Sequence, residues 1–301
     1  MIPAWLARLP PNVQGALWLV SGGFIFTSTS AMIRLLSEQV DSVQSAFFRS
    51  AIGLALLVPY LVTGRVRPWA STRIAGHFWR TLVGTTSMVC GFYAVALMPL
   101  ADATALSFSQ PLFSVVIAAV IVGEKVRWRR WTATVVGFLG VLVMVRPGAG
   151  VLEPGAAIAL LNALLVAFSI LLVKRLTDTE DPLTILTVFA LFSTLLLAPA
   201  AVWVWRWPDL WGWVLALGIA GSATVGQYFW VQAFKVGEMS AVAPFEYLRL
   251  PFAVFMGWLL WGEMPVVWTY LGAAIVIASA IYIARREAQL ARERRQAQKP
   301  S

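Results

Sequence analysis

The chain has 301 residues, of which 59% are hydrophobic and 12% are charged, and its formal net charge is +9. Its mean hydropathy is +0.78. A soluble domain is about 45–50% apolar and about 25% charged, so this composition excludes an ordinary soluble protein. The single cysteine, Cys90, excludes an intrachain disulfide and a metal site built from cysteines. We expect neither a metal nor a cofactor.

Ten apolar stretches are long enough to cross a bilayer as helices, which takes about 20 residues each. They are apolar on nearly every face, as expected of helices surrounded by lipid. No cleavage-site pattern follows the first stretch, so we interpret it as a retained helix. The chain is therefore predicted to be an all-α membrane protein with ten transmembrane helices. The stretches are residues 13–33, 43–63, 77–97, 101–122, 130–146, 154–173, 182–204, 211–233, 239–261 and 266–284.

The basic residues between these stretches predict the orientation of the chain, because cytoplasmic loops are enriched in Lys and Arg. Of the 23 Lys and Arg, 18 fall on the side that holds both termini, and only Arg34, Arg146 and Arg206 fall on the other. We therefore expect both termini in the cytoplasm, with residues 285–301 as a basic cytoplasmic tail. Because the charge lies in short loops beside lipid, we expect no nucleic-acid partner. The larger set is Arg8, Arg65, Arg67, Arg73, Arg80, Lys125, Arg127, Arg129, Arg130, Lys174, Arg175, Lys235, Arg285, Arg286, Arg292, Arg294, Arg295 and Lys299.

The chain contains an internal repeat, in which residues 91–140 correspond to residues 228–279. Pro111 recurs as Pro251, and Gly123-Glu124 recurs as Gly262-Glu263. We expect two five-helix repeats, 13–146 and 154–284, joined by a turn-rich segment. An odd number of helices inverts the second copy relative to the first. Inverted repeats are typical of secondary transporters, whose substrate site lies near the middle of the membrane where the halves meet.

Four segments together resemble the EamA-type members of the drug/metabolite transporter superfamily. They are 47-FFRS-50, 101-ADATALSFSQPLF-113, 137-GFLGVLVMVRPG-148 and 240-SAVAPFEYLRLPF-252. The resemblance extends over about residues 15–285. It implies a carrier for small metabolites in the bacterial inner membrane, and amino-acid exporters are the best-known members. The resemblance does not determine the substrate, because the fold also carries vitamins, S-adenosylmethionine and organic cations.

Glu246 and Arg249 are the central candidates for binding a substrate, since ionisable groups inside the bilayer are costly and are retained for function. Their i, i+3 spacing places them on one face of a helix. A carboxylate and a guanidinium presented together match the ammonium and carboxylate of an amino acid. The alternative interpretation is a permanent ion pair that holds the ninth helix in place.

Further polar and aromatic residues complete the predicted site. Ser107 and Gln110 lie on a polar stripe of the fourth helix that must face protein or water. Tyr93, Trp230, Tyr247 and Gln227 are expected to line an aromatic cavity suited to apolar or cationic side chains.

Pro111 and Pro251 are expected to kink matched helices and to act as hinges, while Glu124 and Glu263 are expected to serve as helix-end anchors or gate contacts. For Arg49, in the second helix, we expect either a partner such as Asp102 or Glu263 or a side chain that reaches the interface.

We predict an alternating-access carrier for amino acids and related small metabolites that works as an exporter and as a monomer. Uptake of a larger metabolite, such as S-adenosylmethionine or riboflavin, is the second hypothesis. A channel is a third interpretation. A membrane enzyme is disfavoured because the one histidine, His77, lies at the cytoplasmic edge of the third helix, and because the sequence has no Gly-x-Ser-x-Gly, His-Glu-x-x-His or paired intramembrane Asp motif.

Overall fold

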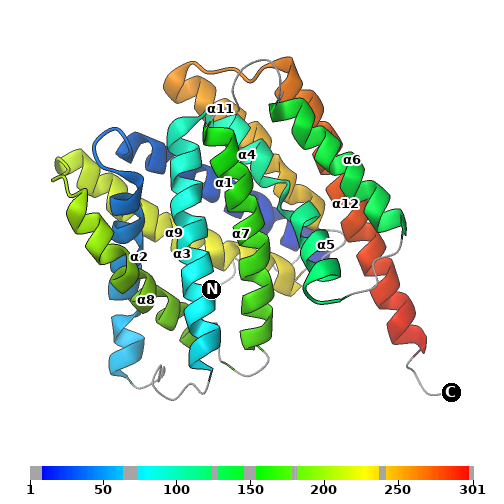
Figure 1. Cartoon of the computed structure of the whole chain (residues 1–301), viewed down its shortest axis with the longest axis horizontal. Coiled ribbons are helices and arrows are strands. Elements are labelled where there is room, and N and C mark those ends of the chain that lie inside the picture. The colour runs from blue at the N-terminus through cyan, green and yellow to red at the C-terminus, as the bar shows by residue number, and fades with distance from the viewer. Residues whose placement is uncertain are drawn as a thin grey trace.

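The computed structural model describes residues 9–63, 73–123, 128–145, 154–177, 180, 182–236 and 242–297, and these form a bundle of helices without strands. Figure 1 shows the helices stacked side by side, with most of them running between the same two ends of the molecule. The helices of the first half are α1 (Pro11–Leu36), α2 (Ser42–Val62), α3 (Ile74–Leu97), α4 (Leu100–Ser107), α5 (Gln110–Val120) and α6 (Trp128–Val145). Those of the second half are α7 (Pro154–Thr177), α8 (Pro182–Trp203), α9 (Leu210–Val236), the 3-10 helix η3 (Ala243–Leu248), α11 (Arg249–Trp261) and α12 (Val267–Ala297).

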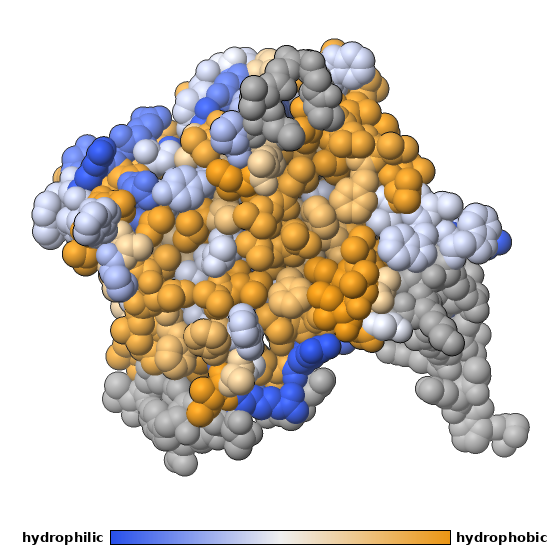
Figure 2. Space-filling view, viewed as in Figure 1, coloured by the Kyte–Doolittle hydropathy of each residue, from blue (hydrophilic) through white to orange (hydrophobic). Residues whose placement is uncertain are grey.

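All ten predicted stretches are helical, but the described residues contain only six segments that meet the length and hydropathy of a membrane span. These lie in α1, α2, the α4–α5 pair, α7, α8 and α9, and shorter apolar helices occur at 131–145 and 267–283. Two features explain why the third and ninth stretches do not meet this criterion. The ninth stretch is divided between η3 and α11, and α3 carries Arg80 and His77 in its first third. Figure 2 shows a broad apolar band across the middle of the molecule, with hydrophilic residues gathered at its two ends.

Helices of the first half pair with helices of the second half. Helix α1 packs along α9 and α7 packs along α3, while α2 packs on α8 and α6 packs on α12. Each of the first two pairs contains a hydrogen bond between side chains. Thr29 Oγ1 and Ser222 Oγ lie 2.7 Å apart between α1 and α9, and Ser87 Oγ donates to Asn162 Oδ1 at 2.9 Å between α3 and α7. The two halves are therefore interleaved rather than separate.

Small residues allow the closest of these approaches. A Cβ added to Gly22 of α1 would lie 3.3 Å from Phe229 Cβ, and one added to Gly226 of α9 would lie 3.3 Å from Ile25 and Phe26 of α1. Helices in a membrane associate through such van der Waals contact, because lipid supplies no hydrophobic driving force between them.

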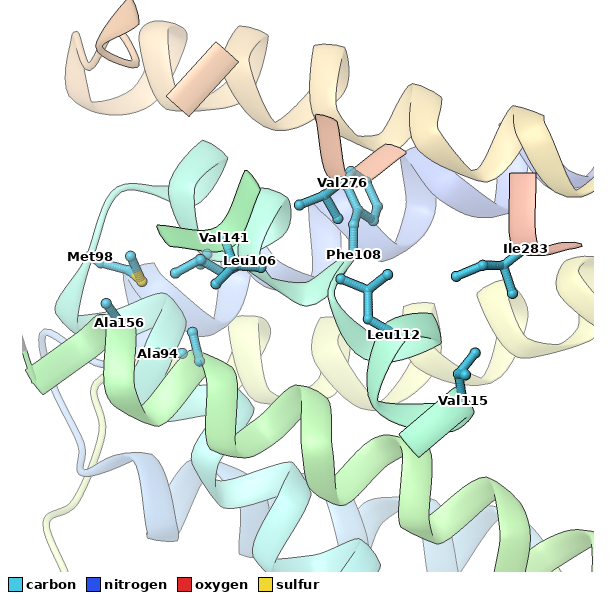
Figure 3. Packing of buried hydrophobic residues seen from close by; sticks show 12 residues of the cluster. Ala94, Met98, Leu106, Phe108, Leu112, Val115, Val141, Ala156, Val276 and Ile283 are labelled. Atoms are coloured by element: carbon cyan, nitrogen blue, oxygen red, sulfur yellow. The ribbon is translucent and has the colours of Figure 1, made fainter. Parts of the chain in front are cut away.

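The largest buried cluster surrounds the fourth span. Phe108, Leu112 and Val115 meet Val141 of α6 and Val276 of α12, as Figure 3 shows. Met98, Leu106 and Ala156 extend the cluster toward α7. The break in the fourth span is thus surrounded by apolar side chains from both halves.

We expect Gly272→Ala to lower the free energy of unfolding in detergent by about 1–3 kcal/mol, as overpacking does elsewhere. An added Cβ would overlap Met144 Cγ and lie 2.5 Å from the carbonyl oxygen of Gly140, so α6 and α12 would have to separate. Gly221→Ala in α9 is the matched control, because nothing lies within 4 Å of a Cβ there. Thermal unfolding of both variants measures the effect, and equal midpoints would contradict it.

The basic tail continues the last helix. Helix α12 has 31 residues, which corresponds to about 46 Å at 1.5 Å per residue and exceeds the roughly 30 Å of a bilayer's hydrocarbon core. Residues 285–297 thus extend as a helix beyond the apolar stretch that ends at residue 284.

Candidate substrate site

Both helices that carry the repeated proline are broken, where the sequence predicted only kinks. In the fourth span, α4 ends at Ser107 and α5 begins at Gln110, and the N–H groups of Phe108 and Ser109 bond to carbonyls three residues earlier. In the ninth span, η3 changes to α11 at Arg249. Pro111 and Pro251 are the second and third residues of α5 and α11. Proline lacks the N–H that a continuous helix would need at these positions, and the early turn of a new helix tolerates it.

The two repeats also end their broken spans alike. Gly123 after α5 and Gly262 after α11 have positive φ values of 73° and 66°. Glycine adopts this left-handed conformation without steric penalty, and Gly262 directly caps α11. Helix α5 ends three residues before Gly123, at Val120. The residue after Gly262 is Glu263. Glu124, which follows Gly123, lies outside the described residues.

Glu246 and Arg249 lie at the break in the ninth span, on consecutive turns of η3 and α11. Arg249 Nη1 is 4.0 Å from Glu246 Oε1, and the two side chains are 25% and 39% exposed, respectively. The pair is long for an ion pair, so neither group has all of its hydrogen-bonding capacity occupied. Arg249 Nε is buried and has no hydrogen-bond partner in the part of the chain that the structure describes.

Helix α1 supplies the wall beside Arg249. A Cβ added to Gly23 would lie 3.0 Å from Arg249 Cγ, so the absent side chain makes room for the arginine stem. The guanidinium lies 5.6 Å from the ring centroid of Phe26, close enough for a cation–π contact. A glycine and an aromatic ring one turn apart on α1 therefore hold the arginine at the break.

Tyr247 connects the two breaks. Its ring packs edge to face on Phe108, with ring centroids 5.0 Å apart. Ser107 and Gln110 lie on either side of that phenylalanine, and both are half-buried. Their polar groups are bonded within their own span, Ser107 Oγ to the carbonyl of Thr104 at 2.7 Å and Gln110 Nε2 to Ser114 Oγ at 3.1 Å.

The structure brings together only part of the predicted set. Glu246, Arg249 and Tyr247 meet the fourth span at its break, whereas Tyr93 donates its hydroxyl to Asp41 Oδ1 at 2.7 Å, just before α2 begins. Trp230 and Gln227 lie on an exposed part of α9. A substrate role for these residues stays a prediction.

Glu263 pairs with Arg34 rather than with Arg49. Arg34 donates two hydrogen bonds to the carboxylate, at 2.6 and 2.5 Å, and its guanidinium lies 4.3 Å from the ring centroid of Trp261. Expecting Glu263 or Asp102 as the partner of Arg49 was wrong. The guanidinium of Arg49 instead donates to the Sδ of Met88 at 2.6 Å.

The two broken spans meet at one end and not at the other. Helices α4 and α11 pack on each other, and Leu100, Ala253 and Trp261 share a cluster there with Ala31. Among the described residues, α5 and η3, the complementary halves, do not form a packed pair. The Arg34–Glu263 pair lies at the closed end.

A second asymmetry separates the two repeats. Helix α5 packs on α6, but a groove of about 480 Å³ lies between the corresponding α11 and α12. The groove is entirely apolar, and its lining includes Pro251, Val254, Trp258 and Tyr270. Helix α11 thus lies closer to α4 and α1 than to α12.

Interleaved apolar helices, with one broken span in each half, define a multi-pass membrane transporter. The EamA-like transporter family matches residues 13–146 and again residues 153–285, so the chain belongs to this family. The expected resemblance to the drug/metabolite transporter superfamily is thereby confirmed, and the double match fits a two-repeat architecture.

Similar proteins cover nearly the whole chain. A riboflavin transporter of Vibrio cholerae is 29% identical over 290 residues, which are 94% of this chain and 97% of the relative. An S-adenosylmethionine uptake transporter of Rickettsia prowazekii is 27% identical over 91% of this chain and 94% of its own. The pseudopaline exporter CntI of Pseudomonas aeruginosa is 28% identical over 90% of this chain and 96% of the exporter. A solved crystal structure shares the fold with a TM-score of 0.60, at 18% identity over 91% of this chain and 98% of its own.

Proposed function

We propose that the protein is an alternating-access carrier of the bacterial inner membrane that moves amino acids and metabolites bearing an amino-acid group. In this proposal both termini lie in the cytoplasm, the second five-helix repeat is inverted relative to the first, and the carrier works as a monomer. The distribution of Lys and Arg supports the orientation. The family and the three relatives support transport, and their printed substrates differ from one another.

The observation that carries the substrate class is the pair of Glu246 and Arg249 at the break of the ninth span. The 4.0 Å separation leaves a carboxylate and a guanidinium that a zwitterion can engage at the same time. Guanidinium binds carboxylate through paired N–H donors, and a carboxylate accepts from ammonium. S-adenosylmethionine has the same amino-acid group, so the proposed class includes the substrate named for the Rickettsia relative.

The unequal ends of the broken spans support a direction and a mechanism. With the termini in the cytoplasm, the packed α4–α11 end faces outward and the separated α5–η3 end faces the cytoplasm. Substrate would then enter from the cytoplasm, as export requires. The half-helices rock about Pro111 and Pro251, which breaks the Arg34–Glu263 contact. Glu124 stays a predicted gate contact.

Uptake of a larger aromatic metabolite such as riboflavin is the second candidate. It is favoured by the aromatic groups next to the charged pair, Phe26, Tyr247 and Phe108, which could stack on a flat ring system. The Vibrio cholerae relative is named for that substrate.

Counterflow in proteoliposomes distinguishes these proposals. Vesicles are loaded with an excess of one unlabelled compound from a panel of amino acids, S-adenosylmethionine and riboflavin, and uptake of its labelled form is followed. We expect saturable accumulation of amino acids or S-adenosylmethionine, and none in protein-free vesicles. Accumulation of riboflavin alone would replace the first proposal with the second, and flux without saturation or counterflow would indicate a channel.

A further inference from the structure

Two arginines lie inside the bundle away from the broken spans, between α2, α3 and α8. Arg49 belongs to α2 and Arg80 to α3, and these two helices pack on each other and on α8. The loop-charge count assigned Arg80 to the cytoplasmic loops, which was wrong. Arg80 lies seven residues into α3, and its guanidinium is 4.2 Å from the ring centroid of Phe189 on α8.

The two guanidinium groups lie against consecutive turns of α3. Nη1 of Arg80 lies over Gly84, where a Cβ would overlap it, and Nη1 of Arg49 contacts the Sδ of Met88. Gly84 and Met88 are four residues apart and therefore share a helix face.

Neither arginine has a carboxylate partner among the described residues. Ion pairs seen there join Arg34 to Glu263, His77 to Glu180 and Arg249 to Glu246, and none of them includes Arg49 or Arg80. Nε and Nη1 of Arg80 are buried and have no hydrogen-bond partner in the described ranges. Within the described residues, the hydrogen bond of Arg49 goes to a thioether, which accepts hydrogen bonds only weakly.

Two buried hydroxyl groups on the same two helices also lack hydrogen-bond partners within the described part of the chain. They are Thr85 Oγ1, adjacent to Gly84 on α3, and Ser45 Oγ, one turn before Arg49 on α2. A buried cation is costly unless an anion and hydrogen bonds compensate it, and a buried hydroxyl without a partner adds to this cost. Two adjacent cations and two spare hydroxyls are the donor set that an oxyanion would satisfy.

We propose that Arg49 and Arg80 form an oxyanion-binding site that holds a carboxylate or phosphate group of a metabolite, separately from the Glu246–Arg249 site. Each guanidinium presents a planar fork of N–H donors that matches the oxygens of either group. Thr85 and Ser45 can donate one further hydrogen bond each. The proposal depends on the proposed transport function only in taking the anion from a metabolite, since anion binding can be measured without transport.

Thermal unfolding of the purified full chain in detergent tests the site, with inorganic phosphate as the probe and sodium chloride at equal ionic strength as the reference. A ligand that binds the folded state raises the unfolding midpoint as its concentration rises. We expect phosphate to raise the midpoint of the wild type and of E246Q. In R80Q the apparent Kd should increase about tenfold or more, because hydrogen bonds to a charged group are lost. R129Q, which removes an exposed arginine of α6, should behave as the wild type.

The variants also distinguish a ligand site from a structural one. Without phosphate, R80Q should unfold at the same temperature as the wild type or higher, since an uncompensated buried charge has been removed. A lower midpoint for R80Q without phosphate, or an unchanged phosphate response in R80Q, would overturn the proposal. If R80Q does not fold, R80K serves instead, because it retains the charge and loses the fork. Stabilisation by phosphatidylglycerol nanodiscs but not by phosphate would assign the anion to a lipid headgroup and would also overturn the proposal.

Discussion

Replacing Glu246 with Gln is expected to lower the rate of amino-acid counterflow by about tenfold or more, the usual cost of losing a hydrogen bond to a charged group. The substitution keeps the shape of the side chain and removes the charge that would hold a substrate ammonium group. The Glu246 side chain is 39% exposed and 4.0 Å from its neighbour, so it is available to a ligand. Counterflow in proteoliposomes of equal protein content is the measurement.

E38Q is the matched control for this variant, because Glu38 is exposed and follows the end of α1, fifteen residues beyond Gly23, where α1 contacts Arg249. The double variant E246Q/R249Q separates binding from a structural ion pair. If the pair serves only to hold α11 in place, removing both charges should restore thermal stability and transport together. If the pair binds substrate, the double variant should fold and still fail to transport. Normal counterflow by E246Q would reject the site.

Breaking the Arg34–Glu263 pair is expected to open the end of the molecule where α4 meets α11. In E263Q, a cysteine placed at Ala253 should react about fivefold faster with a membrane-impermeant maleimide, corresponding to about 1 kcal/mol for a partly exposed ion pair. Ala253 is fully buried at that contact, and the bidentate geometry makes the pair stronger than a single hydrogen bond. The experiment uses a Cys90→Ala background, since Cys90 is the one native thiol.

The charge-swapped variant R34E/E263R should return the labelling rate toward that of the parent, because the pair is restored with opposite polarity. A cysteine at Ala280, buried in α12, reports general unfolding and should label equally in all variants. Equal labelling at Ala253 with and without the pair would show that α4 and α11 stay closed without it.

Much of the fold was accessible from the sequence because a bilayer imposes strong constraints. Every spanning helix must be apolar along its length, so all ten predicted stretches are helices, most with ends within about three residues of the prediction. The repeat could be recognised for a related reason. A glycine with positive φ and a proline in the first turn of a helix are positions that few other residues tolerate, and both recur.

Part of the candidate site could also be predicted from the sequence, because its residues are close together in the chain. Glu246 and Arg249 are three residues apart, so their proximity follows from helical geometry alone. The neighbours of Arg249 were not accessible in this way. Gly23 and Phe26 lie more than 200 residues away in the chain, and they reach the arginine only because α1 packs on η3 and α11.

The sequence by itself determined the helical membrane fold, the two repeats and the matched positions of proline and glycine, because each follows from hydropathy or from the backbone limits of these two residues. Tertiary structure alone decided which charges meet. Arg34 and Glu263 are both helix-end residues that would suit several partners, and the packing of α1 on α11 selects one. Arg80 was counted with the loop arginines. In the structure it lies inside the bundle, because Gly84 leaves room for its guanidinium and Phe189 of α8 packs against it. Long flexible side chains reach about 6 Å or more from their backbone, so sequence position does not reveal their environment.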